Sequence, residues 1–530
     1  MRTARAALAC LLVVAVGIVL VSGGSDSDPR TPPALVGLPP PFLGTAVSGD
    51  GGLTAAVDAY GDVVDLRLGP AGAALIDNPS DRQAAGTVAE DTGIVPRVGG
   101  KAMWEADRVT QRYLPGTNVV RTVARFGSRR VVMTTAAAGR SLAVVVRSSG
   151  GATPSLSVNV ASGVRCARQR RAALLDLICG FGRAVPPAAA AGDVIAAATA
   201  EGRHWLARSP SLNAAAPSWA HALYDRSLLT IHTLTSLATG AVAAGARDGW
   251  AYVWPRDAAT AALALEASGH HAEARHVAKF LTALDLNAAA RFTETGAPVP
   301  GRAAQGDALG WVTVAAKATG IKPPHEPYPW RNRADYQESS PGTYLANALA
   351  ATVTHVDGPK TGLFDKFSAH QHGGLVRVAG EPGSGLDSAA GWAVRPFRIR
   401  ALYPAAERTL LRLVEQGTPF GITPGEGWEG GNDPWTAPTA WSAWALAALA
   451  RTGVRDPRTN LPAVREGGGP TRPSPSRRSA LTLLNDLRRA ATPAGDLPER
   501  VGAHTGIPTS TTPLLWSSAF TVLALRELWP

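Results

Sequence analysis

The sequence predicts a β-sandwich followed by a toroid of α-helices. Val-rich stretches typical of strands fill the segment from about residue 42 to residue 200. From about residue 215 the pattern changes to consecutive helices, which are joined by long loops rich in glycine and proline. At 530 residues the chain is also too long for one ordinary hydrophobic core, so we expect two or more domains.

The N-terminal segment has the composition of an export signal. Arg2 and Arg5 precede an apolar run from Ala6 to Val21, and small residues follow it. The run is short for a membrane-spanning helix, so a cleaved signal and an uncleaved membrane anchor both remain open. We assign residues 1–25 to this signal or anchor and residues 26–41 to a Pro-rich tether. The chain is therefore expected to be exported, either to the extracellular space or to the cell envelope.

Strand and turn signals recur along residues 42–200, which we assign to the β-sandwich domain. Thr54–Val57 and Val63–Leu66 flank a turn around Gly61 and predict a hairpin. An Ala-rich helical linker is expected near the end of the domain. Three more Val-rich strands are predicted at Asn118–Phe126, Arg129–Thr135 and Ser141–Ser148.

The chain has three cysteines, of which Cys10 lies inside the apolar N-terminal run. In an exported protein the remaining pair, Cys166 and Cys179, would form a disulfide; two free thiols are the alternative. The cysteine spacing of a zinc site is absent, and we expect neither a metal nor a cofactor.

Residues 201–530 are assigned to the helical domain. Its predicted loops are rich in aromatic and acidic residues, which suits a toroid with its functional site in the loops at one end. The helices are predicted at residues 218–239, 258–268, 272–283, 343–354, 403–416, 438–451, 479–491 and 513–528.

The chain is basic, with a net charge of +11 and a pI of about 10.0. This balance is compatible with nucleic acid, with an anionic envelope surface or with a simple compositional bias toward arginine. The arginines are scattered, and neither a basic helix nor an Arg–aromatic platform is present, so we do not expect nucleic-acid binding.

Two acidic motifs and an Arg–Asp motif lie in predicted loops that lead into helices. Glu338 ends the stretch Asp-Tyr-Gln-Glu, and Glu499 follows Pro498. Two carboxyl groups can act as the general acid and the general base that cleave a glycosidic bond. The alternative for Glu338 is stabilisation of the next helix N-terminus, and the alternative for Glu499 is a surface pair with Arg500.

The Arg–Asp motif is Trp254-Pro255-Arg256-Asp257. Arginine supplies a planar fork of donors and aspartate supplies acceptors, so together they can bind two sugar hydroxyls. A buried ion pair, or capping of a helix by Asp257, is the structural alternative.

The order of these motifs resembles glycoside hydrolase family 15, the glucoamylase-like enzymes, over almost the whole mature chain. The match includes Pro498-Glu499 and the later Pro513–Ala519 stretch. Prokaryotic members place a β-sandwich before an (α/α)6 barrel, and the resemblance implies that fold here. It also implies that Glu338 is the general acid and Glu499 the general base, and that Trp254, Arg256 and Asp257 bind the sugar at the non-reducing end.

A further family-like stretch runs from Pro424 to Trp435, and the resemblance makes Glu426 a sugar-binding acid and Trp435 a wall of the site. The sequence departs from the family pattern at Gln337, where a tryptophan is usual, and before Pro424, where a basic residue is missing. Trp311 or Trp330 could supply the stacking wall instead.

The resemblance implies an inverting, exo-acting hydrolase that releases glucose from α-linked oligosaccharides or polysaccharides. Two alternatives remain open. The first is an enzyme of the same family that acts on trehalose or an α-1,6-glucan. The second is a non-catalytic glycan-binding or envelope scaffold protein, an alternative that Gln337 motivates.

Overall fold

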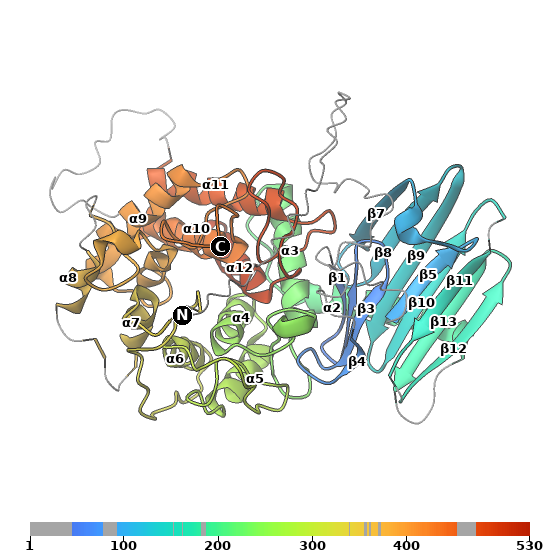
Figure 1. Cartoon of the computed structure of the whole chain (residues 1–530), viewed down its shortest axis with the longest axis horizontal. Coiled ribbons are helices and arrows are strands. Elements are labelled where there is room, and N and C mark those ends of the chain that lie inside the picture. The colour runs from blue at the N-terminus through green and yellow to red at the C-terminus, as the bar shows by residue number, and fades with distance from the viewer. Residues whose placement is uncertain are drawn as a thin grey trace, which may run out of the picture.

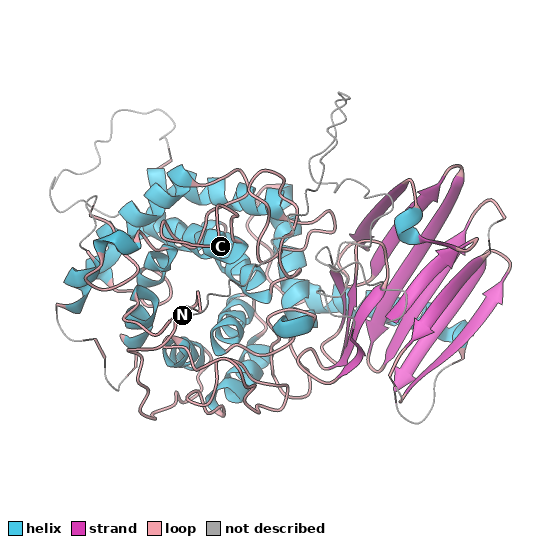
Figure 2. Ribbon diagram, in the orientation of Figure 1, coloured by secondary structure: helices cyan, strands magenta, loops and turns pink. Residues whose placement is uncertain are grey.

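The computed structural model describes residues 45–530 except 78–92, 152, 162, 182–186, 339, 355–357, 360–361, 369–372 and 453–472. The predicted signal and tether, residues 1–25 and 26–41, lie outside the described residues. Two β-sheets occupy one end of the molecule, and a ring of helices occupies the other (Figures 1 and 2). Within the described part of the chain, no helix has the length and hydrophobicity that crossing a membrane requires.

The N-terminal part is a sandwich of two antiparallel sheets whose facing side chains, such as Leu53 and Met133, share one hydrophobic core. The predicted hairpin is confirmed as β2 and β3. The first sheet contains β1 (Ala46–Gly49), β2 (Leu53–Val57), β3 (Val63–Leu68), β4 (Ala74–Asp77), β5 (Gly93–Val98), β6 (Lys101–Ala102) and β11 (Pro154–Asn159). The second contains β7 (Arg108–Tyr113), β8 (Val120–Phe126), β9 (Arg129–Ala138), β10 (Ser141–Ser148), β12 (Val164–Arg171) and β13 (Leu174–Phe181).

The first three strands are buried on both faces. One face lies in the sandwich core, while Val47, Ala56 and Val64 pack into the core of the helical part. The second contact explains why β2 is buried along its whole length and lacks the alternation of a strand with one solvated face. Helix α2 (Ala191–Ala207) packs on β9 and β10 and leads into the helices.

The disulfide between Cys166 and Cys179 is confirmed. The two cysteines lie directly opposite each other in the antiparallel pair β12–β13.

Six inner elements of the described helical part form a closed circuit, in which each packs on the next and the last packs on the first. Figure 1 shows the labelled α-helices of this circuit around a common centre. In order they are α4 (Pro255–Ala267), α6 (Ala308–Ala318), α7 (Leu345–Ala351), the short 3-10 helix η6 (Ser388–Ala393), α10 (Thr436–Thr452) and α12 (Leu515–Leu528). Outside them lie α3 (Ser218–Thr233), α5 (His271–Thr282), α8 (Leu363–Phe367), α9 (Tyr403–Gln416) and α11 (Pro475–Ala490).

An aromatic cluster fills the centre of this circuit. The rings of Trp311 and Trp392 meet edge to face at 5.1 Å, and those of Trp392 and Trp441 at 5.5 Å. All three are fully buried, and Trp330 is only 2% exposed. Trp311 and Trp330 therefore stabilise the core and do not replace the missing tryptophan at position 337.

A buried polar cluster joins the sandwich to the helices. The Asp496 carboxylate accepts a hydrogen bond from the Tyr113 hydroxyl at 2.8 Å and lies 3.5 Å from Arg226 Nε. The Arg226 guanidinium stacks on the Tyr113 ring at 3.8 Å and donates to Asn118 Oδ1 at 2.6 Å. Burial raises the pKa of Asp496, and Arg226 opposes that rise.

Loss of the Asp496 carboxylate is expected to destabilise the protein. Asp496→Ala leaves Arg226 buried without its anion, and breaking a buried pair in this way costs about 3–5 kcal/mol. We expect a lower urea midpoint, and a smaller decrease for Asp496→Asn, whose amide oxygen still accepts from Tyr113. An unchanged midpoint in Asp496→Ala would show that this cluster does not stabilise the junction.

Candidate active site

A cavity of about 220 Å³ opens at the end of the ring where the loops preceding α4, α7, α10 and α12 meet; we call it the site cavity. The sequence-predicted residues that line it are Trp254, Arg256, Asp257, Glu338, Trp435 and Glu499. The other lining residues are Ala244, Gly249, Trp250, Arg302, Tyr336, Gln337, Leu514 and Trp516.

The start of α4 places the Arg–Asp motif in the site cavity. Trp254 is the N-cap residue and Pro255 occupies the first turn, where its missing N–H is not needed. Arg256 and Asp257 follow in that turn. The ion pair expected as the structural alternative is present, with Arg256 Nε 3.7 Å from Asp257 Oδ2, and both residues also line the cavity.

Arg256 is held rigidly from several sides. Its Nη1 donates to Asp307 Oδ2 at 2.9 Å and to Gln305 Oε1 at 2.8 Å. The guanidinium also stacks over the Trp516 ring at 4.5 Å. This arrangement fixes the direction of its remaining donors before any ligand enters.

Asp257 is an unusual carboxyl group. Burial raises its pKa to about 7; the nearby Arg256 opposes this rise, while the negative charges of Asp307 and Glu499 add to it. Near neutral pH this carboxyl group is therefore present in both protonation states, so it can accept a hydrogen bond or donate one.

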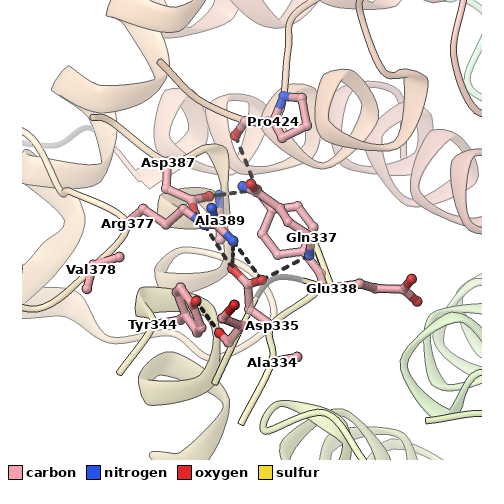
Figure 3. A network of polar contacts seen from close by, with 12 residues as sticks. Ala334, Asp335, Gln337, Glu338, Tyr344, Arg377, Val378, Asp387, Ala389 and Pro424 are labelled. Carbon is pink, nitrogen blue, oxygen red and sulfur yellow. Dashed lines mark hydrogen bonds and ion pairs between the residues drawn. The ribbon is translucent and has the colours of Figure 1, made fainter. Parts of the chain in front are cut away.

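Glu338 projects from a tightly held turn. The Asp335 carboxylate accepts hydrogen bonds from Arg377 Nη2 at 2.9 Å and from Arg377 Nε at 3.1 Å, and its backbone carbonyl accepts from the Glu338 N–H at 3.0 Å. Glu338 has a φ of +58°, a left-handed conformation that is costly for a residue with a side chain. Figure 3 shows its carboxylate directed away from the Asp335–Arg377 cluster.

The Glu338 carboxylate is partly exposed and meets two residues of the loop before α6. Arg302 Nη1 forms an ion pair with Glu338 Oε2, and Gln305 Nε2 lies 3.4 Å from Oε1. Arg302 thus supplies a positive charge at the cavity wall, beside the group that the sequence assigns as the acid.

Gln337, at the position where the sequence departs from the pattern of the family that it resembles, also lines the site cavity. Its Nε2 donates to the Tyr336 hydroxyl at 2.9 Å, and that hydroxyl donates to Asp387 Oδ1 at 2.8 Å. Figure 3 places Gln337 beside Asp387 and Pro424. The wall of the site cavity is therefore formed at this position by an amide group and not by an aromatic ring.

Glu499 lies on the loop before α12, and its backbone is fixed on both sides. Its N–H donates to the Thr511 carbonyl at 2.8 Å, and its carbonyl accepts from the Thr436 N–H at 3.0 Å. The carboxylate accepts from the Ser510 hydroxyl and from Trp250 Nε1, the latter at 3.4 Å. The surface pair expected as its alternative is not the main contact of Arg500, whose Nε donates to Thr509 Oγ1 at 3.1 Å.

Burial raises the pKa of Glu499, while the hydrogen bonds from Ser510 and Trp250 lower it. For the general base that the sequence predicts at Glu499, the ionised form is the one that accepts a proton, and these two donors favour that form. Loss of the Ser510 hydroxyl is expected to raise the pKa of Glu499 further. In Ser510→Ala, the acidic limb of the kcat/KM profile should therefore move to higher pH by about 0.5–1 unit, the worth of one hydrogen bond.

Ser510→Thr is the matched control for this prediction, because it keeps the hydroxyl and should keep the wild-type limb. An acidic limb that does not move in Ser510→Ala would contradict the assignment of that limb to Glu499.

The stretch from Pro424 to Trp435 is only partly in the site. Trp435 lines the site cavity, with its ring 5.1 Å from that of Trp428. Glu426 is not among the lining residues. Its carboxylate accepts from the Leu386 N–H at 3.0 Å and from Gln416 Nε2 at 2.9 Å, contacts that tie its loop to the loop before η6 and to the end of α9.

Sequence reasoning did not select Trp250, Arg302 or Trp516 as site residues. Trp250 lies four positions before Trp254 in the same aromatic stretch, which was the available signal. The sequence contains no comparable signal for Arg302, because the loop that carries Arg302 is far from Glu338 along the chain and only folding brings the two together. Among the described residues, no group of three or more His, Cys, Asp or Glu side chains is arranged to hold a metal ion.

No protein-family model matches this chain, and no curated protein matches it in sequence. Among solved structures, a bacterial glucoamylase complexed with acarbose is similar over 97% of this chain and 96% of its own, with a TM-score of 0.67 and 13% identity. Glucoamylases from Saccharomycopsis fibuligera (58% and 94% covered, TM-score 0.43, 15% identity) and Hormoconis resinae (59% and 73% covered, TM-score 0.45, 13% identity) match less completely. The chain therefore has the glucoamylase-like fold of glycoside hydrolase family 15.

Proposed function

We propose that this chain is an exported, inverting, exo-acting glycoside hydrolase that releases glucose from the non-reducing ends of α-glucosides or α-glucans. The observation that carries the proposal is that Glu338 and Glu499, from separate loops, line the same cavity as Arg256 and Asp257. Cleavage with inversion needs two carboxyl groups on opposite sides of one bond, about 6.5–9.5 Å apart.

Each carboxyl group has one role in the proposed reaction. Glu338 donates its proton to the glycosidic oxygen as the bond to the anomeric carbon breaks. Glu499 takes a proton from the water that attacks the opposite face of that carbon. Trp250 and Ser510 hold Glu499 by its two oxygens, which fixes the direction in which it accepts that proton.

The remaining cavity residues suit the terminal sugar of a chain. Arg256 and Asp257 offer a donor and a carboxyl group whose pKa is about 7, while Trp254 and Trp435 offer aromatic faces. The cavity volume of about 220 Å³ is below the range of ordinary ligand pockets. This small volume supports exo action, because it limits entry to the end of a substrate.

The helical part is proposed to be an (α/α)6 barrel. The closed circuit of α4, α6, α7, η6, α10 and α12 supplies the six inner members, with η6 in the place of one inner helix. The outer elements α3, α5, α9 and α11 pack against α12, α4, η6 and α10 respectively, as alternating hairpins require.

Export is the proposed localisation. It is supported by the basic and apolar N-terminal segment and by the Cys166–Cys179 disulfide, a bond that persists in oxidising compartments. N-terminal sequencing of the protein from culture medium and from membranes would separate secretion from anchoring. Recovery of all the protein in the cytosol, with Met1 or Arg2 at its N-terminus, would contradict export.

A substrate panel of maltose, longer maltodextrins, isomaltose, panose and trehalose tests the proposal and its closest alternatives. Preference for trehalose or isomaltose would favour the related specificities. A non-catalytic glycan-binding protein is the second candidate, because Gln337 removes an aromatic wall and Arg302 ion-pairs with Glu338. Acarbose, the ligand of the bacterial glucoamylase, is a binding probe that needs no turnover. Acarbose binding without glucose release from any substrate would support this second candidate.

A further inference from the structure

A second and larger cavity lies between the sandwich and the ring of helices. Its volume is about 950 Å³, and we call it the interdomain groove. One wall comes from the β3–β4 hairpin, including Arg67 and Ala73. The other wall comes from the helical part, including Tyr252 and Arg291. The proposed reaction gives this groove no role.

The interdomain groove adjoins the site cavity, since Gly249 lines both. The Arg291 side chain bridges them: its Nη1 donates to the Gly249 carbonyl at 3.2 Å. Its guanidinium lies 4.8 Å from the ring of Tyr252 in the groove and 5.7 Å from the ring of Trp254 in the site cavity. The two cavities therefore border each other at Gly249, where Arg291 contacts residues of both.

The two walls are fixed relative to each other. The Glu294 carboxylate, on the helical side, accepts from the Ala71 N–H at 3.0 Å, and the Glu294 N–H donates to the Ala71 carbonyl at 3.1 Å. Gly69 has a φ of +71°, and a Cβ there would come within 2.5 Å of the Glu294 carboxylate, so only glycine allows this approach. On the sandwich side, both oxygens of Asp65 hold Arg67 at 2.9 Å.

The chemistry of the groove suits an uncharged polyhydroxylated chain. Arg67 and Glu294 are already paired within the protein, so the walls present fixed donors and acceptors without a concentrated charge of one sign. Tyr252 is half-buried and adds an aromatic surface with a polar end. The groove volume lies within the range of ligand sites, whereas the site cavity can hold only the end of a substrate.

We propose that the interdomain groove binds the part of an α-glucan chain that extends beyond the site cavity, so that the β-sandwich supplies one wall of an extended substrate site. This inference rests on the proposed function. It predicts that longer malto-oligosaccharides gain affinity or rate from contacts with the sandwich, and that maltose does not.

The test places a bulky side chain on one wall of the groove at a time, in two separate variants. Ala73 and Thr295 are exposed positions on opposite sides of the groove, so Ala73→Trp and Thr295→Trp leave the core unchanged. The measured quantity is the ratio of kcat/KM for maltoheptaose to kcat/KM for maltose. We expect this ratio to fall about tenfold in each variant, which corresponds to about 1.4 kcal/mol of lost contacts.

Ala189→Trp, at an exposed position on the short 3-10 helix beside the sandwich, is the matched control and should keep the wild-type ratio. The inference is supported if this kcat/KM ratio changes by more than about threefold, in either direction, in the groove variants and not in the control. A wild-type ratio in both groove variants overturns the inference. If the wild-type protein hydrolyses neither substrate, the proposed function itself fails, which is a different outcome.

Discussion

Glu499→Gln is expected to lower kcat by roughly 10²–10⁴-fold, the usual worth of general acid–base catalysis. Glutamine has the shape of glutamate: its amide oxygen can still accept from Trp250 while its NH2 donates to the Ser510 hydroxyl, but it cannot take a proton from water. Ground-state binding should survive, because the Arg256–Asp257 pair is untouched. Steady-state kinetics on maltodextrin and calorimetric titration with acarbose measure the two effects separately.

Glu415→Gln is a matched control for this substitution. Glu415 is an exposed acid on α9, 68% accessible, and it pairs with Arg412. Its replacement should leave kcat within about twofold of the wild type, as expected for a surface ion pair. If Glu499→Gln keeps wild-type kcat, Glu499 is not the base.

Glu338→Gln is the second substitution with a large expected effect, and its effect should depend on the leaving group. A natural sugar leaving group needs the proton of Glu338, so kcat on maltose should fall by roughly 10²–10⁴-fold. The leaving group of an aryl α-glucoside with an acidic phenol needs little protonation, so the decrease in kcat on that substrate should be much smaller. Kinetics on a series of aryl glucosides with different phenol pKa values measures this dependence.

The same series of aryl glucosides, measured on Glu499→Gln, is the control. Loss of the base should lower kcat to a similar extent for good and poor leaving groups. Equal losses for maltose and an activated aryl glucoside in Glu338→Gln would contradict its assignment as the acid.

The parts of the fold that the sequence predicted have strong local signals. The β2–β3 hairpin follows from two Val-containing segments around Gly61, which has a φ of +97°. Helix α9 matches its predicted range, Tyr403–Gln416, because its apolar residues fall on one face. Both elements carry their pattern in consecutive residues, independent of the rest of the chain.

Other elements have no such local pattern. The 3-10 helix η6 is buried throughout and only six residues long, so it lacks the periodicity of an amphipathic helix. Strand β12 is rich in arginine and largely exposed, and pairing with β13 places it in the sheet. Such elements depend on tertiary contacts that a single sequence does not reveal.

The site residues, like the elements of the fold, include some that local sequence motifs predicted and some that depend on tertiary contacts. The motif order predicted that Arg256, Glu338 and Glu499 belong together, and all of them line the site cavity. Glu426 was assigned from its motif, yet its carboxylate bonds with Leu386 and Gln416. Which of several acids enters a cavity depends on long-range loop contacts, and these are set by the folded chain.

The stereochemistry of the first product tests the central claim most directly. If Glu338 is the acid and Glu499 the base, water attacks the face opposite the leaving group, and an α-linked substrate releases β-glucose first. Proton NMR of a fresh maltodextrin digest, recorded before mutarotation, distinguishes the anomers. The account predicts an initial β-anomeric signal that later equilibrates. An initial α-anomer would contradict the inverting assignment of Glu338 and Glu499.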